Sequence, residues 1–166
     1  MKDFKILILA AILLVPAMPW TMAMSGTGFI NETLVGKPAA DFTLETVKGN
    51  KVNLTKYRDG KKAIVFFWAT WCPHCREELK HLNELQKEIN DKGIKIVLIS
   101  LGEEKTTVVE YLERHHYDYE VLLDENQTLE GPYQLVGVPT LFFIDEKGVI
   151  KLVDHAFPSN YEEVFK

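Results

Sequence analysis

The stretch FFWATWCPHCREEL, residues 66–79, holds both cysteines of this 166-residue chain, Cys72 and Cys75. Its first residues overlap the run KKAIVFFWA, residues 61–69, and this run is typical of a central strand buried on both faces. From Pro73 onward the apolar residues follow a helical spacing. One stripe of that helix contains Cys75, Leu79, Leu82, Leu85 or Gln86, and Ile89. The sequence therefore predicts a strand, a turn carrying Cys72, and a helix with Pro73 in its first turn.

This arrangement puts both thiols at the N-terminus of a helix. Unpaired backbone N–H groups and the helix dipole stabilise a thiolate there, and a thiolate is the attacking species in thiol–disulfide exchange. We predict that Cys72, the more exposed thiol in such a turn, attacks a partner and that Cys75 resolves the mixed disulfide. His74 adds a polarisable neighbour that can carry a positive charge.

Two other uses of the cysteine pair are less well supported by the pattern. A purely structural disulfide between Cys72 and Cys75 would remove little chain entropy. A metal site could combine these cysteines with His74 and His81, but one CxxC motif supplies only half of a tetrahedral ligand set. The strand–CxxC–helix context favours a redox-active disulfide. We expect no metal and no cofactor, because the dithiol is itself the redox centre.

The rest of the chain alternates between strand and helix patterns. Strands are predicted at 41–46, 51–55, 94–101, 119–124, 140–145 and 149–154. Helices are predicted at 104–116, as a short helix or turn at 128–135, and after a capping box of Ser159 and Glu162. The last two strands form a hairpin and must be antiparallel, so the sequence predicts an α/β sandwich with a mixed sheet.

The first 24 residues differ from the rest. Lys2 and Lys5 precede an apolar run, residues 6–15, and prolines and small residues follow it. This layout predicts a secretory signal peptide, or a membrane anchor through residues 6–24 if the segment is not cleaved. Residues 25–35 then form a linker and residues 36–166 the folded domain. We expect an exported protein, in the periplasm or at the extracytoplasmic face of the cell membrane, where disulfides persist.

Amino-acid composition and charge indicate a single folded domain and argue against nucleic-acid binding. Apolar residues make up 46% of the chain, which is enough for one folded domain with a proper core. The net charge is −5, and the lysines and arginines are scattered. A nucleic-acid partner is therefore not expected, since it would favour a clustered basic face.

The stretches FFWATWCPHC, residues 66–75, and VGVPTLFFIDEKG, residues 136–148, resemble the thioredoxin superfamily. The resemblance implies a thioredoxin-like three-layer sandwich in which a cis-proline, Pro139, faces the CxxC motif. The Val138 backbone would then meet an incoming peptide. The substrate-binding residues implied are Trp71, Pro73, His74, Val138 and Pro139.

The opening stretch GKPAADFTLETVKGNKVNLTKYRDGK, residues 36–61, resembles the short N-terminal β extension of the TlpA/ResA branch. Members of that branch are exported, often membrane-anchored thiol–disulfide oxidoreductases. The resemblance implies protein thiols and disulfides as partners, with apocytochrome c as a candidate substrate during cytochrome c maturation, and an upstream redox donor.

Three features around the motif bear on this branch assignment. Glu78 matches an acid that ResA-like members place beside the site, and we predict that it acts as a proton relay for Cys75. The position of thioredoxin's buried acid holds Phe66. The dipeptide Pro73-His74 resembles that of DsbA-type oxidases and implies a more oxidising disulfide than the branch usually has.

Two rival functions use a similar fold. A peroxiredoxin-like peroxidase needs Thr three residues and Pro seven residues before its reactive cysteine, but Ala69 and Val65 stand there. A copper- or zinc-binding metallochaperone uses a longer cysteine spacing and a distant histidine, and no histidine lies just before Pro139. The lone strand-end histidine, His155, is predicted to be structural.

Overall fold

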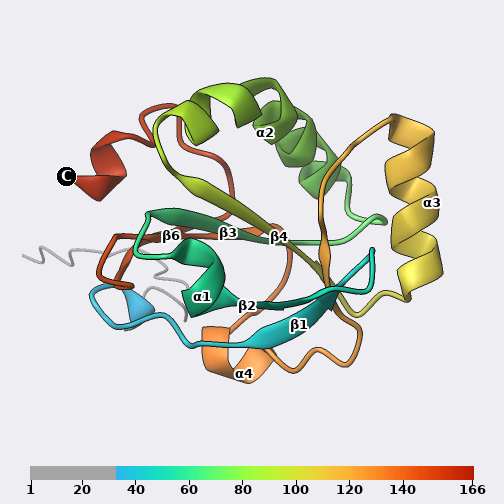
Figure 1. Cartoon of the computed structure of the whole chain (residues 1–166), viewed down its shortest axis with the longest axis horizontal. Coiled ribbons are helices and arrows are strands. Elements are labelled where there is room, and N and C mark those ends of the chain that lie inside the picture. The colour runs from blue at the N-terminus through green and yellow to red at the C-terminus, as the bar shows by residue number, and fades with distance from the viewer. Residues whose placement is uncertain (1–32) are drawn as a thin grey trace, which may run out of the picture.

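The computed structural model describes residues 33–166. The segment predicted as signal peptide or anchor, 1–24, and most of the predicted linker, 25–35, lie outside the described residues. In the described part, seven strands form one mixed sheet in the order β2-β1-β5-β4-β3-β6-β7 (Figure 1). The strands are β1 (Thr43–Thr46), β2 (Lys51–Asn53), β3 (Ala63–Trp68), β4 (Lys95–Leu101), β5 (Leu122–Asp124), β6 (Thr140–Ile144) and β7 (Ile150–Asp154). The helices are α1 (Leu54–Arg58), α2 (Pro73–Asp91), α3 (Lys105–His115), α4 (Glu130–Tyr133) and the 3-10 helix η2 (Glu163–Phe165).

Helices cover both faces of the sheet. Figure 1 shows α2 and α3 on one side of the sheet and α1 and α4 on the other. The side chains of β3 alternate between the two cores: Phe66 and Trp68 lie on the side of α2 and α3, whereas Val65 and Phe67 lie on the side of α1 and α4. All residues of β3 are buried. The predicted central strand and the predicted three-layer sandwich are confirmed.

The N-terminal extension forms two strands, as predicted, and they pair as a hairpin at the edge of the sheet. β1 pairs antiparallel with both β2 and β5, and Gly49 has a φ of +86° in the turn between β1 and β2, a conformation that favours glycine. The second predicted strand ends at Asn53 instead of Thr55, and helix α1, which the strand pattern did not indicate, follows it. Asn53 accepts a hydrogen bond from Lys56 N at 3.0 Å, so an N-cap side chain ends the strand there.

The end of β3 lies between two other chain segments. β3 is parallel to β4 and antiparallel to β6, with Trp68 opposite Ser100 and Phe67 opposite Thr140. The carboxyl end of β4 and the amino end of β6 therefore flank the turn that carries Cys72. This register brings residues from three distant parts of the sequence to one edge of the sheet.

Helix α2 has the buried stripe that its sequence predicts. Its buried residues are Cys75, Leu79, Leu82 and Ile89. The helix ends at Asp91, with Lys92 as C-cap, and Gly93 follows with a φ of +72°. A glycine with positive φ just after the C-cap is a common helix ending, and Gly93 closes α2 in this way.

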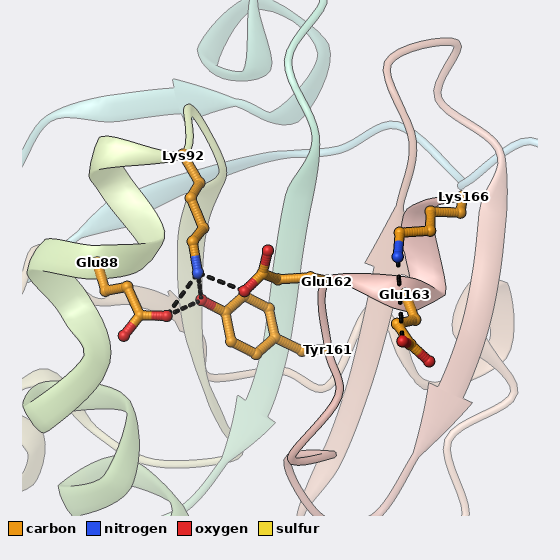
Figure 2. Close-up of polar contacts among 6 residues, drawn as sticks. All are labelled: Glu88, Lys92, Tyr161, Glu162, Glu163 and Lys166. Carbon is orange, nitrogen blue, oxygen red and sulfur yellow. Dashed lines mark hydrogen bonds and ion pairs between the residues drawn. The ribbon is translucent and has the colours of Figure 1, made fainter.

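The C-terminal segment differs from its prediction. Residues 159–162 form turns, and only the short helix η2 follows, so the capping box of Ser159 and Glu162 was wrong. Glu162 Oε1 instead accepts a hydrogen bond from Lys92 Nζ at 2.5 Å (Figure 2). Because Lys92 engages this carboxylate, the reciprocal contact that a capping box requires is lost.

Candidate active site

The two cysteines bracket the first turn of α2. β3 ends at Trp68, and the following turn closes with a hydrogen bond from Cys72 N to Ala69 O at 3.2 Å. Cys72 is the N-cap residue of α2, and Pro73 begins the helix, as predicted. Cys72 and Cys75 form a disulfide, with their Cα atoms 5.2 Å apart. The structure therefore shows the oxidised state of the pair.

The sulfur of Cys72 lies at the positive end of the helix dipole. Cys75 N donates a hydrogen bond to Cys72 Sγ at 3.2 Å, a contact that a side-chain oxygen makes at most helix N-caps. Cys72 is 4% exposed and Cys75 is 0% exposed, so Cys72 is the sulfur nearer to solvent. After reduction, the same N–H group and the helix dipole would stabilise a thiolate on Cys72.

The loop before β6 meets the disulfide. The Val138–Pro139 peptide bond is cis, as predicted, and Val138 O lies 3.6 Å from Cys72 Sγ. A disulfide sulfur carries no proton, so this approach is a contact in the oxidised state and can become a hydrogen bond when Cys72 is a thiol. The main chain of the cis-proline loop is thus held at the sulfur that is nearer to solvent.

Exposed side chains surround the disulfide. Trp71 is 68% exposed, and a large aromatic surface of this kind is typical of contact sites. Pro73 is exposed as well. The side chain of His74 is 82% exposed, and its Nδ1 lies 3.6 Å from Glu77 Oε2. Surrounding water therefore weakens any electrostatic effect of His74 on Cys72.

Glu78 lies three residues after Cys75 and is half-buried. Glu78 Oε2 accepts a hydrogen bond from Phe157 N at 2.9 Å. This contact ties the segment after β7 to the first turns of α2. The role of Glu78 as a proton relay for Cys75 stays a prediction, and one carboxylate oxygen would have to serve it while the other accepts from Phe157 N.

A buried carboxylate that the sequence pattern did not indicate supports the cysteine turn. Glu103 is 7% exposed, and it accepts hydrogen bonds from Thr70 N at 2.9 Å, Thr70 Oγ1 at 2.5 Å and Ser100 Oγ at 2.8 Å. Thr70 lies two residues before Cys72, so Glu103 fixes the main chain that leads into the disulfide. Its position was a usable signal, since parallel neighbouring strands end at the same edge of a sheet and Glu103 follows β4.

A surface hollow of about 400 Å³ opens next to the cysteines. Its lining combines aromatic and charged side chains from α2, from α3 and from the residues after α3: Pro73, Arg76, Glu77, Lys80, Tyr111, His115 and Tyr117. Because Pro73 belongs both to this lining and to the CxxC motif, the hollow is continuous with the candidate site.

Residues 33–166 contain neither a membrane-spanning helix nor a cluster of metal ligands. No helix in this range is long and apolar enough to cross a membrane. The same range contains no group of three or more His, Cys, Asp or Glu side chains that could hold a metal ion. His81, a candidate ligand in the metal-site alternative, packs its ring against Phe157, with the ring centroids 5.5 Å apart.

A disulfide at the start of a helix, opposite a cis-proline on a three-layer sandwich, defines a class, the thiol–disulfide oxidoreductases with a thioredoxin-like fold. Comparison with known proteins specifies the family. The model of the AhpC/TSA family matches residues 35–153. The chain therefore belongs to the AhpC/TSA family.

Similar proteins agree with this class. The chain is 32% identical over 157 residues to the thiol-disulfide oxidoreductase ResA of Geobacillus kaustophilus, covering 92% of this chain and 88% of the relative. The thioredoxin domain of a thiol-disulfide oxidoreductase from Bacteroides vulgatus matches with a TM-score of 0.69 and 26% identity, covering 78% of this chain and 94% of that structure. StoA from Bacillus subtilis matches with a TM-score of 0.62 and 27% identity, covering 76% and 94%. The protein is a thiol–disulfide oxidoreductase, as predicted, and its partners are protein thiols and disulfides.

Proposed function

We propose that this protein is exported and exchanges disulfides with proteins in the periplasm or at the extracytoplasmic face of the cell membrane. The observation that carries the proposal is the Cys72–Cys75 disulfide at the N-terminus of α2, with Cys72 against Val138 of the cis-proline loop. Export is supported by the charged start, apolar run and small residues within positions 1–24. In an oxidising compartment, a dithiol of this kind has protein disulfides to act on.

The reaction proceeds in two exchange steps. In the reduced protein, the Cys72 thiolate attacks one sulfur of a substrate disulfide, and the other substrate sulfur leaves as a thiolate. The Cys75 thiolate then attacks Cys72 Sγ, forms the intramolecular disulfide and releases the second substrate thiolate. The substrate gains two electrons and the protein loses two. Run in reverse, the same steps oxidise a substrate dithiol.

The half-buried Val138 and the exposed side chains of Trp71, Pro73 and His74 around Cys72 would bind the substrate. An extended peptide can pair with the Val138 backbone, as peptides pair with an exposed strand edge. Trp71 offers an aromatic surface beside the reacting sulfur. The complete set of proposed substrate-binding residues is Trp71, Pro73, His74, Val138 and Pro139, of which Pro139 is buried and would act by shaping the loop.

Proton transfer is required when Cys75 resolves the mixed disulfide, since a thiol attacks only as its thiolate. We assign this role to Glu78, three residues after Cys75. The assignment rests on the place of Glu78 on α2, one turn after Cys75.

A candidate substrate is an apocytochrome c whose cysteines must be reduced before haem attachment. This part of the proposal rests on the resemblance of residues 36–61 to the TlpA/ResA branch and on the similarity to ResA over most of the chain. Each reduction of a substrate leaves the Cys72–Cys75 pair oxidised. A membrane or extracytoplasmic redox donor must therefore return two electrons for the next cycle.

Trapping of mixed disulfides tests the proposed roles. In a Cys75→Ser variant the first exchange step can occur but resolution cannot, so covalent adducts with partner proteins should accumulate. The variant is expressed with its own N-terminal segment and isolated after thiols are blocked by alkylation. Adducts that disappear on reduction, and that are absent from the matched Cys72→Ser variant, are expected. Equal adducts from both variants would contradict the assignment of Cys72 as nucleophile.

A further inference from the structure

His155 lies directly after β7, where the sheet brings it beside the cis-proline loop. Leu141 of β6 pairs with Asp154 of β7, so the residue after β7 reaches the start of β6. His155 Nδ1 is 2.7 Å from Pro139 O and 3.4 Å from Thr140 Oγ1. The side chain thus meets the carbonyl of the residue that follows the cis bond.

The chemistry of these groups fixes where one proton must be. A carbonyl oxygen only accepts hydrogen bonds, so His155 Nδ1 must donate to Pro139 O. Thr140 Oγ1 donates its own proton to Gly137 O at 2.8 Å, so toward His155 it can only accept as well. His155 therefore carries a proton on Nδ1, and this N–H group points at the cis-proline loop.

We propose that His155 is a positioning residue that holds the cis-proline loop in the conformation that binds substrate, an inference that rests on the proposed exchange function. The carbonyl it holds is in the peptide group next to Val138–Pro139, and Val138 O lies 3.6 Å from Cys72 Sγ. Fixing Pro139 O therefore restrains the main chain that an extended substrate would pair with. His155 itself acts through the loop and need not touch the substrate.

The segment that contains His155 also contacts the other half of the site. Two residues later, Phe157 N donates to Glu78 Oε2 at 2.9 Å, and the Phe157 ring lies 5.5 Å from the ring of His81 on α2. Residues 155–157 thus bridge the cis-proline loop and the helix that carries the cysteines. A defined spacing between these two parts is what a substrate disulfide between them requires.

The proton on His155 can be located without a variant. In the 15N-labelled protein, nitrogen chemical shifts of the imidazole should identify Nδ1 of His155 as protonated at neutral pH. A neutral ring protonated only on Nε2 would overturn the proposal, because Nδ1 could then donate no hydrogen bond to Pro139 O.

A pair of variants separates positioning from general stability. His155→Leu removes the donor and keeps an apolar side chain, whereas His155→Asn keeps an N–H donor near the place of Nδ1. The reduced proteins are mixed with a peptide disulfide and with hydroxyethyl disulfide, which is too small to pair with the loop. The quantity compared is the second-order rate constant for the peptide disulfide divided by that for the small disulfide. This ratio should fall about tenfold in His155→Leu, as expected for one lost hydrogen bond to the binding loop. In His155→Asn it should stay within about twofold of the wild-type value.

The outcomes distinguish this inference from the proposed function. An unchanged ratio in His155→Leu, together with an active wild type, overturns only the role of His155. An equal loss in both variants also overturns it, because the donor would then not be the cause. A wild-type protein that reacts with neither disulfide overturns the exchange function and this inference together.

Discussion

The two ends of helix α2 are held in different ways. At the N-terminus, Cys75 N donates to Cys72 Sγ, and the buried Glu103 holds Thr70 in the preceding turn. At the C-terminus, Lys92 binds Glu88, Tyr161 and Glu162 in a network that is partly open to solvent (Figure 2). The first arrangement fixes a reacting sulfur, and the second attaches the C-terminal segment to the helix.

The two arrangements should differ in how much stability is lost when one hydrogen-bond partner is removed. Glu103 is 7% exposed, whereas the side chains of Lys92, Glu88 and Glu162 are 33%, 51% and 57% exposed. Water can replace a lost partner at the exposed end but cannot easily do so at the buried end. Substitutions near the cysteines should therefore have the larger effects.

The largest effect is expected from Glu103→Ala. The change leaves the buried Ser100 hydroxyl and the part-buried Thr70 N without their acceptor, and the free energy of unfolding should fall by about 2–3 kcal/mol. Urea unfolding followed by tryptophan fluorescence measures this change. The matched control is Glu104→Ala, since Glu104 is exposed and makes no side-chain cap hydrogen bond. Equal losses of stability in the two variants would show that the buried contacts of Glu103 stabilise the fold no more than the exposed Glu104 does.

The second-largest effect is expected from Glu78→Gln, on the rate at which the mixed disulfide is resolved. Glu78→Gln keeps an oxygen that can accept from Phe157 N but removes the group that exchanges a proton. Resolution of the mixed disulfide should slow by about tenfold or more, since general acid–base groups contribute at least that much, while the urea midpoint stays unchanged. Stopped-flow measurement of product thiol release gives the rate. A full rate in Glu78→Gln, with lowered stability in Glu78→Leu, would reduce Glu78 to an anchor for the C-terminal segment.

A smaller effect is expected from His74→Ala. Losing a neighbour that favours the Cys72 thiolate destabilises the reduced form, so the reduction potential should become more negative. One pKa unit corresponds to about 1.4 kcal/mol, or roughly 30 mV for a two-electron couple. The exposure of His74 and its contact with Glu77 place the change at or below this value. Equilibration with glutathione buffers measures it, and a higher potential would contradict an oxidising contribution from His74.

The smallest effect is expected at the other end of α2. Lys92→Met should lower stability only slightly and leave disulfide exchange unchanged. Hydrogen bonds from Lys92 and Tyr161 lower the pKa of Glu88 below its ordinary value of 4.5. The stabilisation is therefore present above that value and is lost as the pH falls through the lowered pKa. Urea midpoints at neutral and acidic pH should show a difference between wild type and variant that disappears in acid, and a difference that grows in acid would be evidence against this role for the network.

Patterns that depend on neighbouring residues made most of the fold predictable. The continuous apolar run ending at Trp68 and the helical stripe through Leu79 and Leu82 specify β3 and α2, because burial on two faces or on one stripe leaves a direct trace in the sequence. The run 51–55 did not reveal α1, since a strand pattern and a capping asparagine overlap at Asn53. The capping box at Ser159 failed because a distant residue, Lys92, competes for Glu162.

The candidate site was predictable where one motif carries it. Cys72, Cys75 and the cis-proline at Pro139 follow from local sequence and the family resemblance. Glu103 and His155 did not, because their roles arise from strand neighbours distant in sequence: β4 beside β3, and β7 beside β6. The resemblance drew attention to Phe66 as the place of a missing acid, while the buried acid that holds the cysteine turn, Glu103, follows the adjacent strand β4.

The central claim, that the Cys72–Cys75 pair serves disulfide exchange, is tested most directly by one comparison of rates. The reduced protein is mixed, in parallel, with a peptide disulfide and with hydrogen peroxide, and oxidation is followed by the fluorescence of Trp68 and Trp71. Fast reaction with the disulfide, slow reaction with peroxide and an intramolecular Cys72–Cys75 bond as product are predicted. Faster oxidation by peroxide would indicate a peroxidase, and stoichiometric metal bound through Cys72 with no reaction toward either oxidant would indicate a metallochaperone.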